Sequence, residues 1–434
     1  MNRDILKNYQ RTLRTPWFYF LREKRKGKMN KNINIIENSS IEMVKGFYSN
    51  GTHCGLKKGK ELDLGIVYSE TKANTYALYT TNKIQGAPLY ICREHLKNNT
   101  SQVLVVNSKI ANTCTGDRGI YNAKITCKEV AKLFNIDMDD VLPMSTGVIG
   151  EELPIEKIKK GILELKKILK DNNENNFSKA IMTTDTYPKI KGVKVKIEDK
   201  EYNIVGTAKG SGMIYPKMAT LLVFIFTDVN IAGGLLKKAF KESINRSFNS
   251  ITIDGDTSTN DTTIIFANGL AGNKKIDTKR SNEYKIFCEA LNAVTIPLAK
   301  KIVKDGEGAT KIIEINTINA KSIKDAKKAC ETIANSNLVK TAFFGEDANW
   351  GRLLCALGYS GVNFIPEKIK LSIGDIDLFK NGKNTGFNED KVNKILKNSE
   401  IKVNIDLNSG NKNWRVWTSD LSYDYVKINA SYRS

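Results

Sequence analysis

A run of six apolar residues, Leu221 to Phe226, follows a loop rich in glycine without any polar spacer. The run contains Val, Ile and Phe, which is typical of a strand that is buried on both faces. The preceding loop contains Gly210, Gly212 and Pro216, and Thr220 is its last residue. The sequence therefore predicts a central strand of a large core, with a hydroxyl group held at the start of that strand.

Thr220 has two interpretations at this position. Threonine is β-branched and begins many strands, so a purely structural role is one of them. The other is a nucleophile, which needs a base beside its hydroxyl. Attack of that hydroxyl on the Ala219 carbonyl would cut the chain and create an α-amine on Thr220, whose pKa of about 7.7–8.0 suits a base. The chain has only two histidines, His53 and His95, which argues against a Ser-His-Asp triad.

The composition narrows the classes of function. The 434 residues carry a net charge of +21, but the lysines are spread along the chain and no nucleic-acid-binding motif is present, so we expect no nucleic-acid partner. The charge would instead attract acidic metabolites. The sequence has no run of 18 apolar residues, so no membrane span is expected. The seven cysteines are scattered and form no CxxC pair, which predicts that the protein lies in a reducing cytoplasm. The same lack of paired ligand spacing predicts no zinc site.

The first 28 residues carry nine Lys and Arg against Asp4 and Glu23. The segment lacks the long apolar core of a signal peptide. We expect residues 1–38 to be a basic N-terminal extension that is dispensable for the fold, and Met29 is an alternative start.

The rest of the chain contains both helical and strand-like patterns. Apolar residues at helical spacing predict helices that pack their apolar faces into the core. We expect helices at 122–134, 154–170, 235–248, 284–303 and 322–334, and strands at 63–68, 77–82, 103–108, 221–226 and 401–407.

Five motifs occur in order along the chain: STGVIG at 145–150, AIMTTDTYPK at 180–189, KGSGMIYPKMAT at 209–220, DGDTSTNDT at 254–262 and GEDANWGR at 345–352. From about residue 45 to the end, the chain resembles the ornithine acetyltransferase (glutamate N-acetyltransferase) family. It departs from the family pattern at Lys109-Ile110, where the family usually has Gly-Asn, and at Ala348, where it has Pro.

The resemblance implies that the chain cuts itself between Ala219 and Thr220, and that the new N-terminal Thr220 is the nucleophile. It implies an oxyanion hole formed by the Thr146 hydroxyl and the Gly147 amide. It also implies these substrate-binding residues: Thr183, Lys209, Thr220, Glu307, Asn429 and Ser434. We interpret DGDTSTNDT as a hydrogen-bonded turn that supports the active site, because the spacing of an EF-hand calcium loop is absent.

The implied fold is an α/β fold, a layered αββα-type sandwich. The implied products of the cut are an α chain, 39–219, and a β chain, 220–434, assembled as an α2β2 heterotetramer. The implied reaction moves an acetyl group from N2-acetylornithine to glutamate in the arginine pathway. It needs no metal or organic cofactor, although some members also use acetyl-CoA as a donor.

Two other functions remain open at this point. One is a self-processing amidohydrolase or aminopeptidase, which would pass its acyl group to water. The other is a basic, non-catalytic protein that binds nucleic acid, which would show strongly salt-dependent binding and no self-cleavage. The substrate-binding positions implied by the resemblance favour the acetyltransferase.

Overall fold

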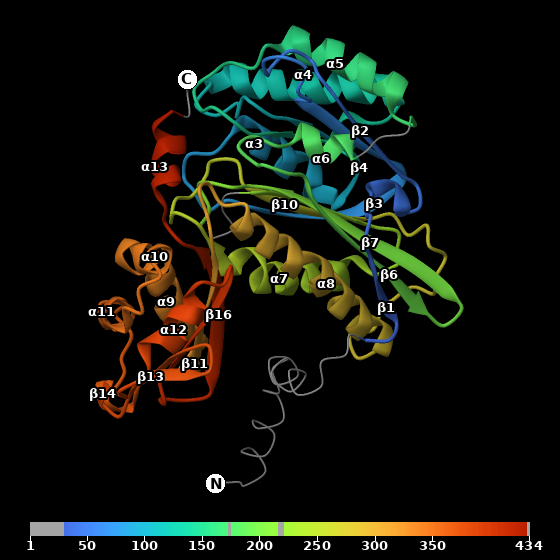
Figure 1. Ribbon diagram of the computed structural model, residues 1–434. Coiled ribbons are helices and arrows are strands. Elements are labelled where there is room, and N and C mark those ends of the chain that lie inside the picture. The colour runs from blue at the N-terminus through green and yellow to red at the C-terminus, as the bar shows by residue number, and fades with distance from the viewer. Residues whose placement is uncertain (1–29, 172–174, 216–220, 432–434) are drawn as a thin grey trace, which may run out of the picture.

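The computed structural model describes residues 30–171, 175–215 and 221–431 (Figure 1). The predicted cut between Ala219 and Thr220, the predicted substrate residue Ser434 and most of the predicted extension lie outside these residues. Within the extension, Ile33–Ile36 forms strand β1, which pairs with β6 at the edge of the larger sheet. Whether the extension is dispensable stays a prediction.

The larger sheet has nine strands in the described part of the chain, in the order β1-β6-β7-β8-β10-β3-β4-β5, with β2 also paired to β3. Strands β8 and β10 are parallel to each other and lie between β7 and β3, to which they are antiparallel. The bounds are β2 (Phe47–Thr52), β3 (Leu64–Tyr79), β4 (Thr100–Asn107), β5 (Val141–Ser145), β6 (Lys189–Ile197), β7 (Lys200–Lys209), β8 (Leu222–Thr227) and β10 (Thr262–Ala267).

Strand β3 corrects the prediction of two separate strands at 63–68 and 77–82. It is one strand of 16 residues. Its first half pairs with β2 and its second half with β10, and its register with β4 shifts between Tyr68 and Ala73. The polar stretch in its middle has the composition of a turn, but it is the solvent-exposed bend of a strand that passes from one half of the sheet to the other.

The prediction that the strand after Thr220 is buried on both faces is confirmed, because every residue of β8 is buried. Phe224 and Phe226 lie in a core together with Val67 of β3 and Leu104 of β4. The sheet therefore folds over, so that its two halves face each other across this inner core. The short helices α3 (Ala87–His95) and α6 (Asn176–Ala180) contribute to the same core.

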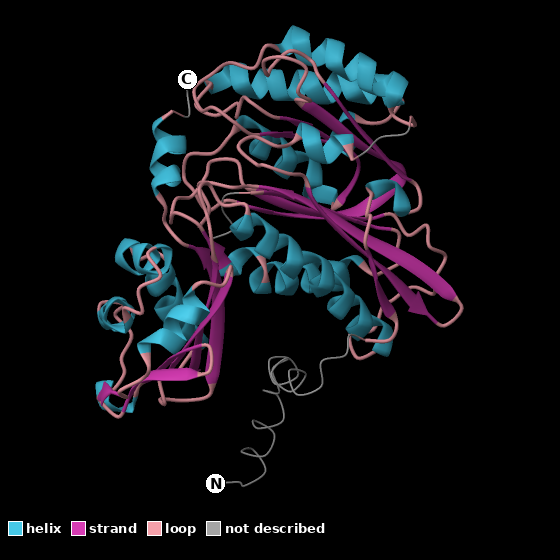
Figure 2. Cartoon of the chain, viewed as in Figure 1, coloured by secondary structure: helices cyan, strands magenta, loops and turns pink. Residues whose placement is uncertain are grey.

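Helices cover the two outer faces of the folded sheet (Figures 1 and 2). Helices α4 (Gly116–Phe134) and α5 (Ile155–Ile168) share a core with β3, β4 and β5. Helices α7 (Gly233–Arg246) and α8 (Asn282–Lys304) share a core with β6, β7, β8 and β10. The resulting order is helices, sheet, sheet, helices, and these four helices lie close to four of the ranges predicted from apolar spacing.

A second sheet, which the predicted sandwich does not contain, lies beside these layers. It has seven strands in the described residues, ordered β14-β13-β12-β15-β11-β16-β9, and a separate core. Its strands are β9 (Ile251–Thr252), β11 (Ile312–Ala320), β12 (Lys370–Ile373), β13 (Ile376–Lys380), β14 (Lys383–Asn384), β15 (Glu400–Asp406) and β16 (Lys412–Ser419). The accompanying helices are α9 (Ile323–Ala334), α10 (Asn337–Phe344), α11 (Trp350–Gly358) and α12 (Glu389–Leu396).

After β16 the chain returns toward the larger sheet as helix α13 (Tyr423–Ala430), which has no buried residue (Figure 1). Short 3-10 helices lie at Ile41–Met43, Leu96–Asn98, Met138–Asp140, Phe248–Ser250 and Pro366–Lys368. No helix in the described part of the chain has the length and apolar character that crossing a membrane requires.

Candidate active site

A cavity of about 270 Å³ opens where the ends of four strands of the larger sheet come together. Thr146 follows β5, Lys209 ends β7, Leu221 precedes β8 and Asp261 precedes β10. The cavity lining includes all the predicted site residues that the structure describes, namely Thr146, Gly147, Thr183, Lys209, Glu307 and Asn429. Thr220 is outside the described residues, but the next residue, Leu221, lines the same cavity.

The Thr146-Gly147 turn is shaped by close backbone packing. Gly147 has a φ of +131°, and a Cβ there would overlap the Lys109 carbonyl group. Thr146 N donates to Asn107 O at 3.0 Å, and Val148 N donates to Lys109 O at 2.8 Å. Among the residues that the structure describes, none accepts a hydrogen bond from the Gly147 amide. This amide and the Thr146 hydroxyl are therefore two donors at the cavity wall, as an oxyanion hole requires.

The Lys109-Ile110 departure lies directly against this turn. Lys109 has a φ of +76°, in the left-handed region that glycine adopts most easily. Ile110 forms a parallel bridge with Val148, and Ala111 N donates to Val148 O at 2.9 Å. The loop therefore keeps its pairing with the Thr146-Gly147 turn although Lys109 replaces a glycine.

Lys209 supplies the cation of the cavity. Its Nζ donates to Thr146 Oγ1 at 3.3 Å. Burial lowers the pKa of Lys209, and the Asp185 carboxylate opposes this shift. Thr183 lies near this end of the cavity, and its backbone amide donates to Asp185 Oδ2 at 3.1 Å.

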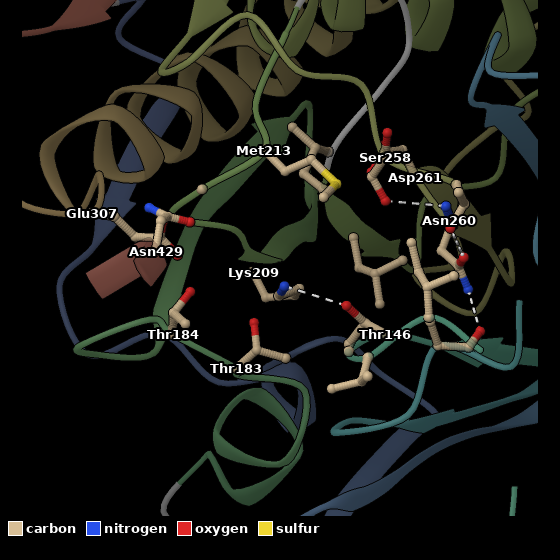
Figure 3. A pocket seen from close by; sticks show the side chains of 18 residues that line it. Thr146, Thr183, Thr184, Lys209, Met213, Ser258, Asn260, Asp261, Glu307 and Asn429 are labelled. Carbon is tan, nitrogen blue, oxygen red and sulfur yellow. Dashed lines mark hydrogen bonds between the residues drawn. The ribbon is translucent and has the colours of Figure 1, made fainter. Parts of the chain in front are cut away.

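Glu307 and Asn429 form a pair from distant parts of the sequence. Asn429 Nδ2 donates to Glu307 Oε2 at 2.8 Å, which links α13 to the loop after α8. Glu307 N donates to Ser211 O at 2.8 Å, and a Cβ on Gly212 would overlap the Glu307 carboxylate. Figure 3 shows Glu307 and Asn429 on one side of the cavity and Asn260 and Asp261 on the other, with Lys209 and Thr146 between them.

The DGDTSTNDT segment contributes more than the predicted supporting turn. Asn260 does support the site, because its Nδ2 donates to Ala111 O at 2.6 Å and to Ser145 O at 2.9 Å. However, the residues from Ser258 to Asp261 also line the cavity directly. Burial raises the pKa of Asp261 well above its ordinary value, which favours the neutral acid.

Sequence reasoning missed Asp261, Thr184 and Met213 as lining residues. For Asp261 a signal was present, since Asp261-Thr262 lies one residue before a second apolar run, much as Ala219-Thr220 precedes the first. Two parallel strands in register bring their starts together, and Thr262 pairs with Leu222. Thr184 and Met213 carry no comparable signal. In the described residues no group of three His, Cys, Asp or Glu side chains is placed to hold a metal ion.

The cavity has the composition of an enzyme site, because a lysine, a carboxylate and two hydrogen-bond donors line it. A lysine and a carboxylate can bind groups of opposite charge, and two donors beside the lysine can stabilise a developing negative oxygen. The chain belongs to the ArgJ family, whose model matches residues 48–434. It is accordingly an acyltransferase of arginine biosynthesis, and the resemblance seen in the motifs is confirmed.

Two relatives illustrate the match. The arginine biosynthesis bifunctional protein ArgJ of Caldanaerobacter subterraneus subsp. tengcongensis is 47% identical over 403 residues, covering 92% of this chain and 100% of the relative. The protein of the same name from Thermotoga neapolitana is 46% identical over 396 residues, covering 90% and 99%. A crystal structure of arginine biosynthesis bifunctional protein ArgJ from Bacillus halodurans is 43% identical with a TM-score of 0.46, and the match covers 48% of this chain and 97% of that chain.

Proposed function

We propose that the chain transfers the acetyl group of N2-acetylornithine to glutamate through an acetyl-Thr220 intermediate, after cutting itself between Ala219 and Thr220. One observation carries this proposal. The six predicted site residues that the structure describes come from five separate segments, yet they line one cavity together with Leu221, the residue bonded to Thr220.

The cut begins when the Thr220 hydroxyl attacks the Ala219 carbonyl and its peptide nitrogen leaves as an α-amine. Water then hydrolyses the ester, which frees the carboxylate of Ala219 and the hydroxyl of Thr220. The α-amine next to that hydroxyl can accept its proton near neutral pH. This supplies a base without histidine.

Transfer follows in two halves. The Thr220 oxygen bonds to the acetyl carbon of N2-acetylornithine, the carbon–nitrogen bond breaks, and ornithine leaves with the proton on its amine. The α-amine of glutamate then attacks the acetyl-enzyme, giving N-acetylglutamate and restoring the hydroxyl. The Thr146 hydroxyl and the Gly147 amide stabilise the oxyanion in both halves, and each such donor typically contributes roughly 100- to 1000-fold in rate.

Charge complementarity orients the substrates. The Lys209 ammonium binds the α-carboxylate that both substrates carry. The Glu307 carboxylate, which Asn429 holds, binds the side-chain ammonium of ornithine. Thr183 and Ser434 complete the substrate site. We further propose an α chain of 39–219 and a β chain of 220–434 in an α2β2 heterotetramer in the cytoplasm, with acetyl-CoA as an optional second donor.

The test compares the wild type with Thr220→Ala and Thr220→Ser by intact-mass spectrometry and by an acetyl-transfer assay. We expect two chains in the wild type, the second beginning Thr-Leu-Leu-Val. Thr220→Ala should remain one chain with no transfer above background, whereas Thr220→Ser keeps a hydroxyl and should still cut, more slowly. A cut and active Thr220→Ala protein would overturn the assignment. Release of acetate at an unchanged rate without glutamate would instead indicate the hydrolase.

A further inference from the structure

A buried cluster of one lysine and two carboxylates lies behind the cavity. Lys189, at the start of β6, donates from its Nζ to Asp185 Oδ1 at 2.6 Å and to Asp305 Oδ2 at 2.5 Å. All three side chains are buried. A buried charge persists only when it is paired and hydrogen-bonded, so this cluster rigidly joins the segment before β6 to the end of α8.

Asp185 also holds the two backbone segments that carry the lysine end of the cavity. Its Oδ1 accepts from Gly210 N at 2.7 Å, and Gly210 directly follows Lys209. Its Oδ2 accepts from Thr183 N at 3.1 Å. Gly210 has a φ of +153°, so the chain turns away from β7 at this contact. One carboxylate therefore fixes Thr183 and Lys209 relative to each other.

The charges around Lys209 come from every side of the cavity. Burial lowers its pKa most, and Asp185 is the strongest group that raises it, ahead of Asp261 and Glu307. Lys189 lowers the pKa of Lys209. Lys209 in turn lowers the pKa of Lys57, on the loop before β3.

Asp185 itself remains ionised. Burial alone would raise the pKa of Asp185, but Lys209 and Lys189 hold it at about 2. Asp185 also raises the pKa of Tyr187, although burial and Asp305 contribute more to that shift. Asp185 is therefore a constant negative charge behind Lys209 at neutral pH.

We propose that Asp185 is the positioning residue of the carboxylate-binding end of the site: it locks Thr183 and Lys209 in place and keeps the Lys209 ammonium charged at neutral pH. This inference rests on the proposed function of Lys209 in binding the substrate carboxylate. Asp185 lies behind Lys209 and is not among the residues that line the cavity, so it acts through its neighbours.

The variant Asp185→Asn tests the inference, because it keeps the shape of the side chain and removes its charge. The first readout is the pH dependence with which trinitrobenzenesulfonate labels Lys209, measured on its peptide by mass spectrometry. We expect the pKa of Lys209 to fall by about one unit or more. The second readout is kinetic. KM for N2-acetylornithine and for glutamate should rise roughly tenfold or more, with a smaller change in kcat, and the alkaline limb of kcat/KM should move to lower pH.

Asp305→Asn is the matched control, since Asp305 is the other carboxylate on Lys189 but bonds neither Thr183 nor Gly210. Asp305→Asn should lower the melting temperature. It should shift the pKa of Lys209 much less than Asp185→Asn does. Equal shifts in the two variants, or none in Asp185→Asn, would overturn the inference.

Labelling needs no turnover, so the inference and the proposed function fail separately. An inactive wild type would contradict the proposed function and still leave the Lys209 titration to be read. If Asp185→Asn does not fold, the titration of Lys209 in the wild type is the deciding measurement. Lys209 largely charged at pH 7.5 supports the inference, and Lys209 largely neutral there overturns it.

Discussion

The Glu307 carboxylate has room beside it only because residue 212 is a glycine. A Cβ on Gly212 would overlap both carboxylate oxygens, which are the far end of a flexible side chain. The backbone of Gly212 does not lie in the left-handed region. An added methyl group should therefore push Glu307 aside and leave the fold intact.

We expect Gly212→Ala to raise KM for N2-acetylornithine roughly 10- to 100-fold, the value of one hydrogen bond to a charged group, with little change in melting temperature. Gly234→Ala is the control, because its Cβ would meet no atom within 4 Å, and it should leave KM unchanged. Steady-state kinetics and thermal melts check both variants. An unchanged KM in Gly212→Ala would show that Glu307 does not hold the substrate.

Individual residues were predictable where a motif of several letters contained them. Thr146, Gly147 and Lys209 lie in such motifs, and the structure brings them to one cavity. Asp185 lies in a motif as well, but its sequence neighbours do not reveal that it bonds the amide of Gly210, 25 positions away. Contacts between distant loops depend on the whole sheet. A single sequence therefore identifies the residues of a motif but does not predict the contacts that they make.

Helix α13 is held by its ends and by a few polar contacts. It has no buried residue, and Tyr423 at its start is 85% exposed and packs edge-on against Phe344. Tyr425 donates to Asp254 at 3.4 Å, and Asn429 donates to Glu307. This helix therefore contributes little to the core and mainly delivers Asn429 to the cavity.

Asn429→Ala should leave the melting temperature unchanged and raise KM for N2-acetylornithine roughly 2- to 10-fold, the value of one ordinary hydrogen bond. Lys427→Ala, an exposed position on the same helix, should change neither quantity. A clear drop in melting temperature for Asn429→Ala would mean that α13 is a structural element, contrary to its exposure.

Elements were predictable in proportion to how regular their apolar pattern is. The burial of β8 on both faces and the helices α5, α7 and α8 follow from such patterns. Strand β3 does not, since polar residues at its bend interrupt the alternation. In the second sheet, the strand predicted at 401–407 corresponds to β15, whose burial alternates regularly. The sheet itself was missed, because β9 pairs with β16 near the end of the chain and a single sequence does not show such a distant pairing.

A buried lysine ties the last strands of the second sheet to the start of the DGDTSTNDT loop. Lys340 of α10 donates to Ile253 O at 2.7 Å, at the start of the DGDTSTNDT loop, and to Ser419 O at 2.5 Å, at the end of β16. Burial lowers the pKa of Lys340 to about 8, against the opposing effect of Asp420 and Asp254. Its ordinary pKa in an unfolded chain is near 10.4.

Between these two pKa values the unfolded chain binds more protons at Lys340 than the folded chain does. Stability from this group therefore rises as the pH increases from about 8 to 10, on the order of 2 to 3 kcal/mol. We expect Lys340→Met to be less stable than the wild type at both pH values, because it leaves two buried carbonyls without their donor, and to lack this rise.

Urea unfolding at pH 8 and pH 10 measures the effect as a difference between wild type and variant, so that other lysines cancel. Lys324→Met, at an exposed position of α9, should match the wild type at both pH values. A wild-type advantage over Lys340→Met that stays constant with pH would contradict the lowered pKa.

The strand order also bears on quality control during biosynthesis. Strands β8 and β10, which follow the proposed cut, are interleaved between β7 and β3, which precede it. Each fragment made alone would expose unpaired strand edges, which favour aggregation. The proposed cut can then give a stable pair of chains only after the full-length chain has formed the larger sheet. A cut chain would therefore be one that had already folded.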